Sequence, residues 1–172
     1  MIAKLLSLNL SKTEFMLIDL PQQISKISNP SISIPSNHPI TSTDSVRNLD
    51  FIFDSSLTFS KQISSLSNAC NYHIHDLRHI RQTLDLKTAY VIATSLVHSK
   101  LDYCNSFYLN LPQKRISRLQ LLQISLVRAV TRIPKSEHIT PVLKSLHWLK
   151  IEERTTTKII SLTYDSLHAS PP

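Results

Sequence analysis

The absence of glycine constrains this chain more than any other feature, because none of its 172 residues is glycine. An average protein of this length contains roughly twelve. Glycine enters left-handed backbone conformations without steric cost. Turns and helix ends must therefore rely here on Asn, Asp, Ser and Pro. A Gly-x-Ser-x-Gly nucleophile elbow is also excluded, and nothing else in the sequence supports Ser-His-Asp catalysis.

Residues 1–59 have the pattern of a small β element. Thr13–Ile18, TEFMLI, is a compact β-prone run that predicts a strand, and the turn-prone segment Asp19–Gln23 follows it. Residues 28–45 are rich in Ser, Pro and Asn, which suits an exposed loop or a short edge hairpin because Pro cannot donate to a ladder. The apolar residues of Val46–Phe53 predict a second strand.

From Ser60 onward the apolar residues recur with the helical period of 3.6. Ser60 is the expected N-cap of a long first helix, and Asp85 is the start signal of a second that ends near residues 101–106. Pro112 suits the first turn of a third helix, which Pro134 should end. A short helix at Pro141–His147 and a last one at Ile151–His168 complete a helical bundle over residues 60–172. The sequence thus predicts an α+β fold.

Positive charge is concentrated in the predicted helical part. Residues 1–60 hold 4 Lys or Arg against 5 Asp or Glu, whereas residues 61–172 hold 15 against 7. Such a basic block favours polyanionic partners, either nucleic acid or an acidic membrane surface, although a solvated basic face has the same composition.

The remaining composition points to an intracellular chain, in the cytoplasm or nucleus. We find no signal peptide, and the longest apolar run, Ala89–Val97, is about half of what a membrane span needs. Cys70 and Cys104 cannot form a disulfide framework and are expected to be buried thiols.

Seven cations have the helical placement expected for phosphate contacts. The candidate nucleic-acid-binding residues are Arg78, Arg81, Lys114, Arg115, Arg118, Arg128 and Arg132. Arg115, Arg118 and Arg132 are expected to share one exposed face beside the apolar stripe of the third helix. Aromatic residues do not alternate with the basic ones, so stacking on single strands is less supported.

Other polar residues have simpler interpretations. His75 and His79 are four residues apart, but a third ligand at suitable spacing is missing, so we expect surface or half-buried histidines and no metal site. Trp148 is expected to be a core anchor where the last two helices meet. The acidic pair Glu152–Glu153 is expected on a solvated helix face.

Several ordered motifs resemble one protein family. Val97–Ser106, VHSKLDYCNS, is followed about thirty residues later by His138–Arg154, HITPVLKSLHWLKIEER. With Leu8–Ile18, Val46–Phe59 and Arg118–Gln123 they resemble, in order and spacing, the region after the polymerase active site of LINE-type (non-LTR) retrotransposon reverse transcriptases. The resemblance implies a palm-tail β element at residues 1–59, with its loop at 28–45, and a thumb-like helical domain at 60–172.

The resemblance also implies that the chain is not an enzyme by itself. In that family the catalytic Asp pair, which holds Mg²⁺, lies on a hairpin before the segment matching Leu8–Ile18, and both ends of the chain are expected to be truncated. The segment Val46–Phe53 resembles the hairpin that grips the primer, with Leu49 and Asp50 at the grip-like position. The family usually has glycine at the positions of Asp19 and Asp50, which suggests a decaying copy of a mobile element. A separate interpretation is that no stable protein is made.

The expected function is residual, sequence-independent binding of an RNA–DNA or DNA duplex by an inactive reverse-transcriptase fragment. No cofactor, membrane or small-molecule substrate is expected as a partner of this chain. The alternative is a helical host interaction module that binds protein or an acidic membrane surface through the same basic face.

Overall fold

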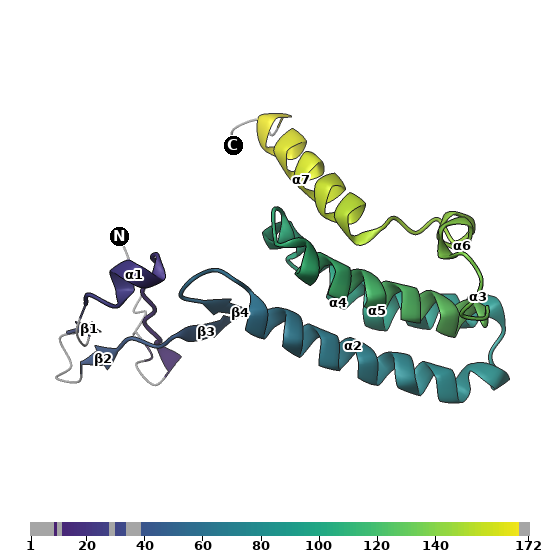
Figure 1. Ribbon diagram of the computed structural model, residues 1–172, viewed down its shortest axis with the longest axis horizontal. Coiled ribbons are helices and arrows are strands. Elements are labelled where there is room, and N and C mark those ends of the chain that lie inside the picture. The colour runs from purple at the N-terminus through teal and green to yellow at the C-terminus, as the bar shows by residue number, and fades with distance from the viewer. Residues whose placement is uncertain (1–8, 10–11, 28–29, 34–38, 169–172) are drawn as a thin grey trace, which may run out of the picture. The chain divides into compact units, whose positions relative to one another are not determined.

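The computed structural model describes residues 9, 12–27, 30–33 and 39–168 (Figure 1). The chain divides into two compact units, the first ending at Gln62 and the second beginning at Ile63. A small region of antiparallel hairpins is followed by helices, which confirms the α+β fold predicted from the sequence.

The first unit holds two antiparallel hairpins. Its elements are α1 (Pro21–Ile24), β1 (Ser31–Ile32), β2 (Ile40–Thr41), β3 (Ser45–Asn48) and β4 (Phe51–Asp54). β1 pairs with β2, and β3 pairs with β4. The strand expected at Thr13–Ile18 is wrong, because Phe15 makes only an isolated bridge to Ser42. A β-prone run becomes a strand only where a neighbouring backbone pairs with it.

The segment Val46–Phe53, which periodicity predicted as one strand and the family resemblance as a hairpin, is a hairpin, in which Asn48 faces Phe51 across a turn at Leu49 and Asp50. Both turn residues have positive φ, 46° and 64°, as in a type I′ turn. The usual Asn-Gly signal of that turn is missing, so the apolar pattern continues through it and conceals the reversal.

Three phenylalanines and two polar side chains hold the end of this hairpin. The ring centroid of Phe51 lies 4.9 Å from that of Phe53 and 5.5 Å from that of Phe59, and the centroids of Phe53 and Phe59 are 6.2 Å apart. The Asp54 carboxylate accepts hydrogen bonds from the amides of Thr58 and Phe59, and the Gln62 side-chain oxygen accepts one from the Ile52 amide. These contacts fix the loop before the first long helix.

The helical elements follow in close succession. They are α2 (Ser60–Ile80), η2 (Arg81–Thr83), α3 (Leu86–Ala93), the π-helical turn η3 (Thr94–His98), α4 (Ser99–Asp102), η4 (Asn105–Tyr108), α5 (Gln113–Thr131), α6 (Ile139–Ser145) and α7 (Ile151–His168). Asp85 is the N-cap of α3, where its side chain accepts a hydrogen bond from the Thr88 amide, as predicted. Ser60 is the first residue of α2 and not its cap.

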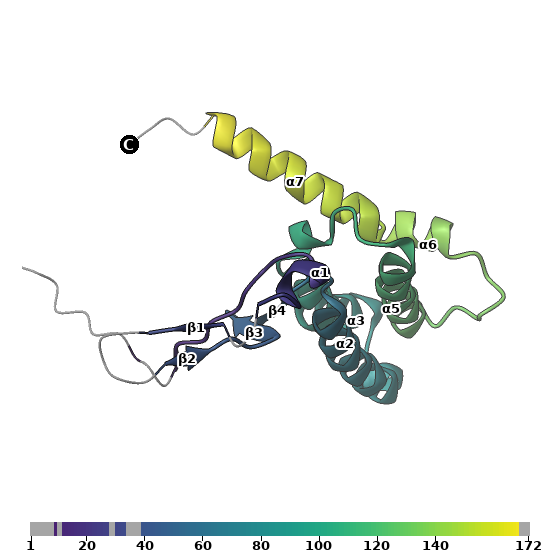
Figure 2. The same ribbon diagram turned by 60° about the vertical axis from the view of Figure 1, so that its left-hand side comes forward.

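Helix α5 is the centre of the second unit, which is called the helical unit below. It runs beside α2 in the same direction, while α3, η3 and α4 return in the opposite direction (Figures 1 and 2). Its buried side chains include five members of the predicted stripe, Ile116, Leu119, Leu122, Leu126 and Val130. The sixth predicted member, Ile133, lies beyond the end of the helix and is half-buried. Helices α3, α6 and α7 also contact α5. The polar Gln123 is fully buried among them, where it donates to the Leu149 carbonyl and accepts from Gln120.

Left-handed residues replace the missing glycines, but mostly not as the sequence suggested. Among the described residues, positive φ occurs at Leu49, Asp50, Leu57, Phe59, Cys104, Asn110, Arg132 and His147. Only Asp50 and Asn110 are of the expected types. Helix α5 accordingly ends at Thr131 with Arg132 as its left-handed C-cap, three residues before Pro134. The fold imposes these conformations where no glycine is available.

The cysteines match the expectation in part. Both are free, with Cys70 buried and Cys104 half-buried. Burial raises the pKa of the Cys70 thiol to about 11, partly offset by the charge of Lys100, so this thiol stays protonated at neutral pH.

Candidate nucleic-acid interface

The seven candidate cations lie in two groups separated along α5. Lys114, Arg115 and Arg118 are in its first two turns, and Arg128 is in its last. Arg128 lies thirteen positions after Arg115, which corresponds to about 20 Å of helix at 1.5 Å per residue. The other three cations, Arg78, Arg81 and Arg132, join Arg128. The expected common face of Arg115, Arg118 and Arg132 is therefore wrong, because Arg132 lies beyond the end of the helix.

The second group lines an open groove of about 990 Å³, here called the basic groove. Its charged lining residues are Arg78, Arg81, Arg128, Arg132 and Lys135, without any Asp or Glu among the residues that line it. The polar Gln82 and Ser125 lie beside them. Five cations around one depression create a positive potential that attracts anions.

All four arginines of the groove donate to backbone carbonyls, and two of them, Arg81 and Arg132, do so at helix ends. Arg81 is only 8% exposed and donates to the carbonyls of Val130 and Leu84, at 2.7 and 2.6 Å. Arg132 donates to the Arg81 carbonyl at 2.8 Å. These carbonyls lie at helix ends, which carry partial negative charge, and the Arg81 carbonyl also accepts from the Leu84 amide. Arg81 was expected as an exposed phosphate contact; it is instead a buried residue that joins two helix ends.

Arg78, Arg132 and Lys135 are exposed, whereas Arg128 is half-buried. Arg78 is exposed and makes a long contact, 3.5 Å, with the Ser125 carbonyl. Arg128 donates to the Lys135 carbonyl at 3.1 Å, while the Lys135 side chain is exposed. Lys135 was not among the candidates. It lies in an irregular segment, where helical spacing gives no signal.

The first group of cations does not line the basic groove. Lys114 and Arg118 are exposed, and Arg118 donates to the Ser64 hydroxyl of α2 at 3.3 Å. Arg115 is half-buried. These residues offer charge at the opposite end of α5.

The grip-like residues lie at the tip of the β3–β4 hairpin. Leu49 is 81% exposed, and Asp50 forms an exposed ion pair with Arg47 at 3.8 Å. Asp50 has φ 64°, the conformation that favours glycine, which the resembling family usually has there.

The motifs Val97–Ser106 and His138–Arg154 meet in the helical unit and have structural roles. Arg154 of α7 forms an ion pair with Asp102 of α4 through two contacts. The contact from Arg154 Nε to Asp102 Oδ1 is 2.7 Å. Asn105 donates to the same carboxylate at 3.4 Å. Trp148 is buried, as predicted, with its ring 3.9 Å from that of His98. Burial and the Arg154 charge lower the pKa of His98 to about 4.

Two side-chain clusters bear on metal and catalytic chemistry. His75 and His79 lie side by side on α2, with 3.1 Å between their Nε2 atoms. Glu152 and Glu153 are exposed, and Glu153 accepts from the Lys150 amide at the start of α7. Among residues 9, 12–27, 30–33 and 39–168, no group of three or more His, Cys, Asp and Glu is arranged to hold a metal ion.

No helix in the described part of the chain is long and apolar enough to cross a bilayer. Comparison with protein-family models, with curated proteins and with solved structures gave no match.

Proposed function

We propose that this chain derives from the palm-tail and thumb region of a non-LTR retrotransposon reverse transcriptase and retains sequence-independent binding of nucleic acid. The parent activity would be RNA-directed DNA polymerisation, which this chain does not perform by itself. Two features support the proposal: the ordered motifs, and an α+β fold in which five cations line one groove of the helical unit.

The observation that carries the binding proposal is the basic groove. An anion in the groove would meet the exposed Arg78, Arg132 and Lys135, while the buried Arg81, together with Arg132, neutralises carbonyls at the helix ends. Without that neutralisation the carbonyl ends of α2 and α5 would repel phosphate. Lys and Arg contacts to phosphate carry no sequence information, so binding should be independent of sequence.

The test is the salt dependence of binding to a short RNA–DNA duplex, followed by fluorescence anisotropy. With three phosphate contacts, log affinity should fall with log salt at a slope near −3, because each contact contributes about −0.9. The double variant Arg78→Ala/Lys135→Ala should flatten the slope by about 2.

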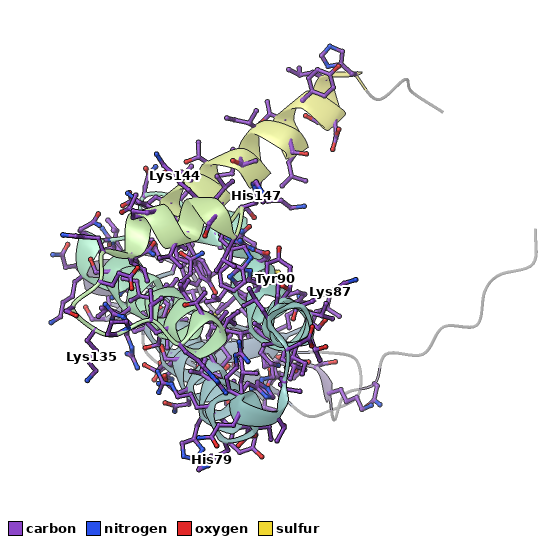
Figure 3. All side chains as sticks on the ribbon, turned by 90° about the vertical axis from the view of Figure 1, so that its right-hand side faces the viewer. His79, Lys87, Tyr90, Lys135, Lys144 and His147 are labelled. Atoms are coloured by element: carbon purple, nitrogen blue, oxygen red, sulfur yellow. The ribbon has the colours of Figure 1, made fainter. Side chains whose placement is uncertain are left out.

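A matched control removes two cations elsewhere on the helical unit. Lys87 and Lys144 are exposed and do not line the groove, and Figure 3 shows Lys87 and Lys135 on opposite sides in that view. Lys87→Ala/Lys144→Ala makes the same change in net charge and should leave the slope within about 0.5 of the unmodified chain. A flat salt response of the unmodified chain, or equal flattening by both double variants, would contradict the proposal.

One observation favours the alternative, a helical interaction module. The C-terminal half of α7 extends away from the other helices (Figures 1 and 2) and exposes Ile160, Leu162, Tyr164 and Leu167. Binding to acidic lipid vesicles as strong as binding to the duplex, and equally sensitive to loss of Arg78 and Lys135, would favour this alternative over nucleic acid.

A further inference from the structure

Two histidines of α2 form a close pair that the proposed function does not use. His75 and His79 are one helical turn apart, their ring centroids are 4.4 Å apart, and the planes are inclined by 72°. Their Nε2 atoms approach to 3.1 Å. Both residues are exposed, and Figure 3 shows His79 at the edge of the helical unit.

The separation of the two nitrogens fits a shared metal ion. Imidazole nitrogens bind Zn²⁺ and similar ions at about 2.0–2.1 Å, so two nitrogens on one ion are about 2.9 Å apart at a right angle and about 3.3 Å apart at the tetrahedral angle. The observed 3.1 Å lies between these values. A direct N–H···N hydrogen bond between the rings has a similar length and is the competing explanation.

The neighbouring carboxylate supports the ligating tautomer. Asp76 Oδ1 lies 3.8 Å from Nδ1 of His75. At this distance the carboxylate makes no direct hydrogen bond, but its charge on that side of the ring favours the proton on Nδ1 and leaves the Nε2 lone pair for a metal. The adjacent Arg78 opposes a cation, and Asp76 offsets part of that repulsion.

We propose that His75 and His79 form a two-imidazole chelate for a borderline divalent metal ion, with water or an external donor in the remaining coordination positions. The helix holds both rings at the required spacing before the metal arrives, so little side-chain entropy is lost on binding. Among Zn²⁺, Ni²⁺ and Cu²⁺ the affinity should be highest for Cu²⁺. The sequence shows that the two histidines are four residues apart but not how their rings are oriented. The sequence therefore predicts surface or half-buried histidines without a metal site.

The experiment titrates Cu²⁺ into the full chain at neutral pH. Calorimetry against a weak competing chelator gives the affinity, and electron paramagnetic resonance gives the number of imidazole nitrogens on the ion. The expected result is one tight site with two nitrogens. His75→Ala or His79→Ala should each weaken that site by roughly 100-fold, because the second ligand no longer acts at high effective concentration.

His73→Ala is the matched control on the same helix. His73 is two residues from His75, its ring contacts Tyr72, and it is half-buried. This variant should keep the wild-type site within about threefold. Alanine favours helix, so circular dichroism should show all three variants folded. The chelate would be overturned if the copper ion on the unmodified chain had only one imidazole nitrogen, or if both His75→Ala and His79→Ala bound copper with unchanged affinity. The two histidines would then be a hydrogen-bonded pair.

Discussion

At the scale of single residues, the main cost of lacking glycine is left-handed backbone at unsuited side chains. Leu49 and Cys104 have φ of 46° and 53°, and His147 has 57°. Such a conformation costs roughly 1–2 kcal/mol for a residue with a Cβ, somewhat less for Asn and Asp. Contacts with the surrounding structure must offset this cost at each position for the left-handed conformation to persist.

Replacing Asp50 by glycine should stabilise the β3–β4 hairpin by about 1 kcal/mol, because glycine adopts φ 64° freely. The exposed ion pair with Arg47 that is lost contributes little. Slower amide exchange in β3 and β4 would show the gain. Asp50→Ala removes the same charge but keeps a Cβ, so it should give no stabilisation; equal protection in both variants would refute the backbone explanation.

His98 is a second residue whose environment has a measurable consequence. It is buried against Trp148, and burial, with the nearby Arg154 charge, lowers its pKa to about 4, while Asp102 acts in the opposite direction. The unfolded chain binds this proton near pH 6.5, whereas the folded chain binds it only near pH 4. Stability is therefore lost as pH falls through this window.

The free energy of unfolding should accordingly fall by about 3 kcal/mol between pH 6.5 and pH 4 through His98 alone. Other groups also titrate there, so the measurement is the difference in pH dependence between the unmodified chain and His98→Gln, from urea unfolding. The variant should lose most of this slope. His147→Gln, at an exposed position, is the control, and identical pH profiles for all three proteins would disprove the assignment to His98.

At the scale of elements, α7 is held at one end only. Its first turns contact α4 through the Arg154–Asp102 ion pair and α5 through the Ile151 amide, which donates to Gln120. Its C-terminal residues are exposed, Leu167 to 75%. A helix with contacts at one end only should be sensitive to the loss of those contacts.

Arg154→Ala should destabilise the helical unit by about 2 kcal/mol, because it leaves the partly buried Asp102 carboxylate without its charged donor. Arg154→Lys should recover less than half, since Lys cannot form the two parallel contacts. Thermal or urea unfolding measures both. Lys158→Ala, one turn later on α7, should cost under about 0.5 kcal/mol; an Arg154→Ala effect no larger than this would count against the anchor.

At the scale of the whole molecule, positive charge and helical structure coincide, but carboxylates are scattered. The exposed Glu153 is occupied at the N-terminus of α7, and Asp102 is paired with Arg154. Phosphoryl transfer needs carboxylates that position two metal ions at the reacting oxygens. Basic helices can hold a duplex without activating a 3′-hydroxyl.

We therefore expect no nucleotide incorporation by the purified chain on any primer–template, with Mg²⁺ or Mn²⁺. Primer extension with labelled nucleotide is the measurement, and an intact reverse transcriptase in the same buffer is the positive control. Extension that persists through purification and disappears on substitution of one of the chain's own Asp or Glu residues would reject the proposal of an inactive fragment.

The sequence by itself determined the α+β order, the N-cap at Asp85, the apolar stripe of α5 and the burial of Trp148. These depend on local periodicity and capping, which neighbouring residues encode. Periodicity failed at the Leu49–Asp50 turn, where only the family resemblance predicted a hairpin, and at the end of α5. In both places a residue type that gives no turn signal, Leu49 or Arg132, is left-handed.

Tertiary structure decided which polar groups meet. Arg81 reaches the Val130 carbonyl, and Arg154 reaches Asp102, across about fifty residues of chain. The relative placement of α2 and α5 decides which cations bind carbonyls at the helix ends and which can still bind an anion. Hydrogen-bond partners so far apart in sequence are set by the packing of helices against one another, and helical periodicity contains no information about that packing.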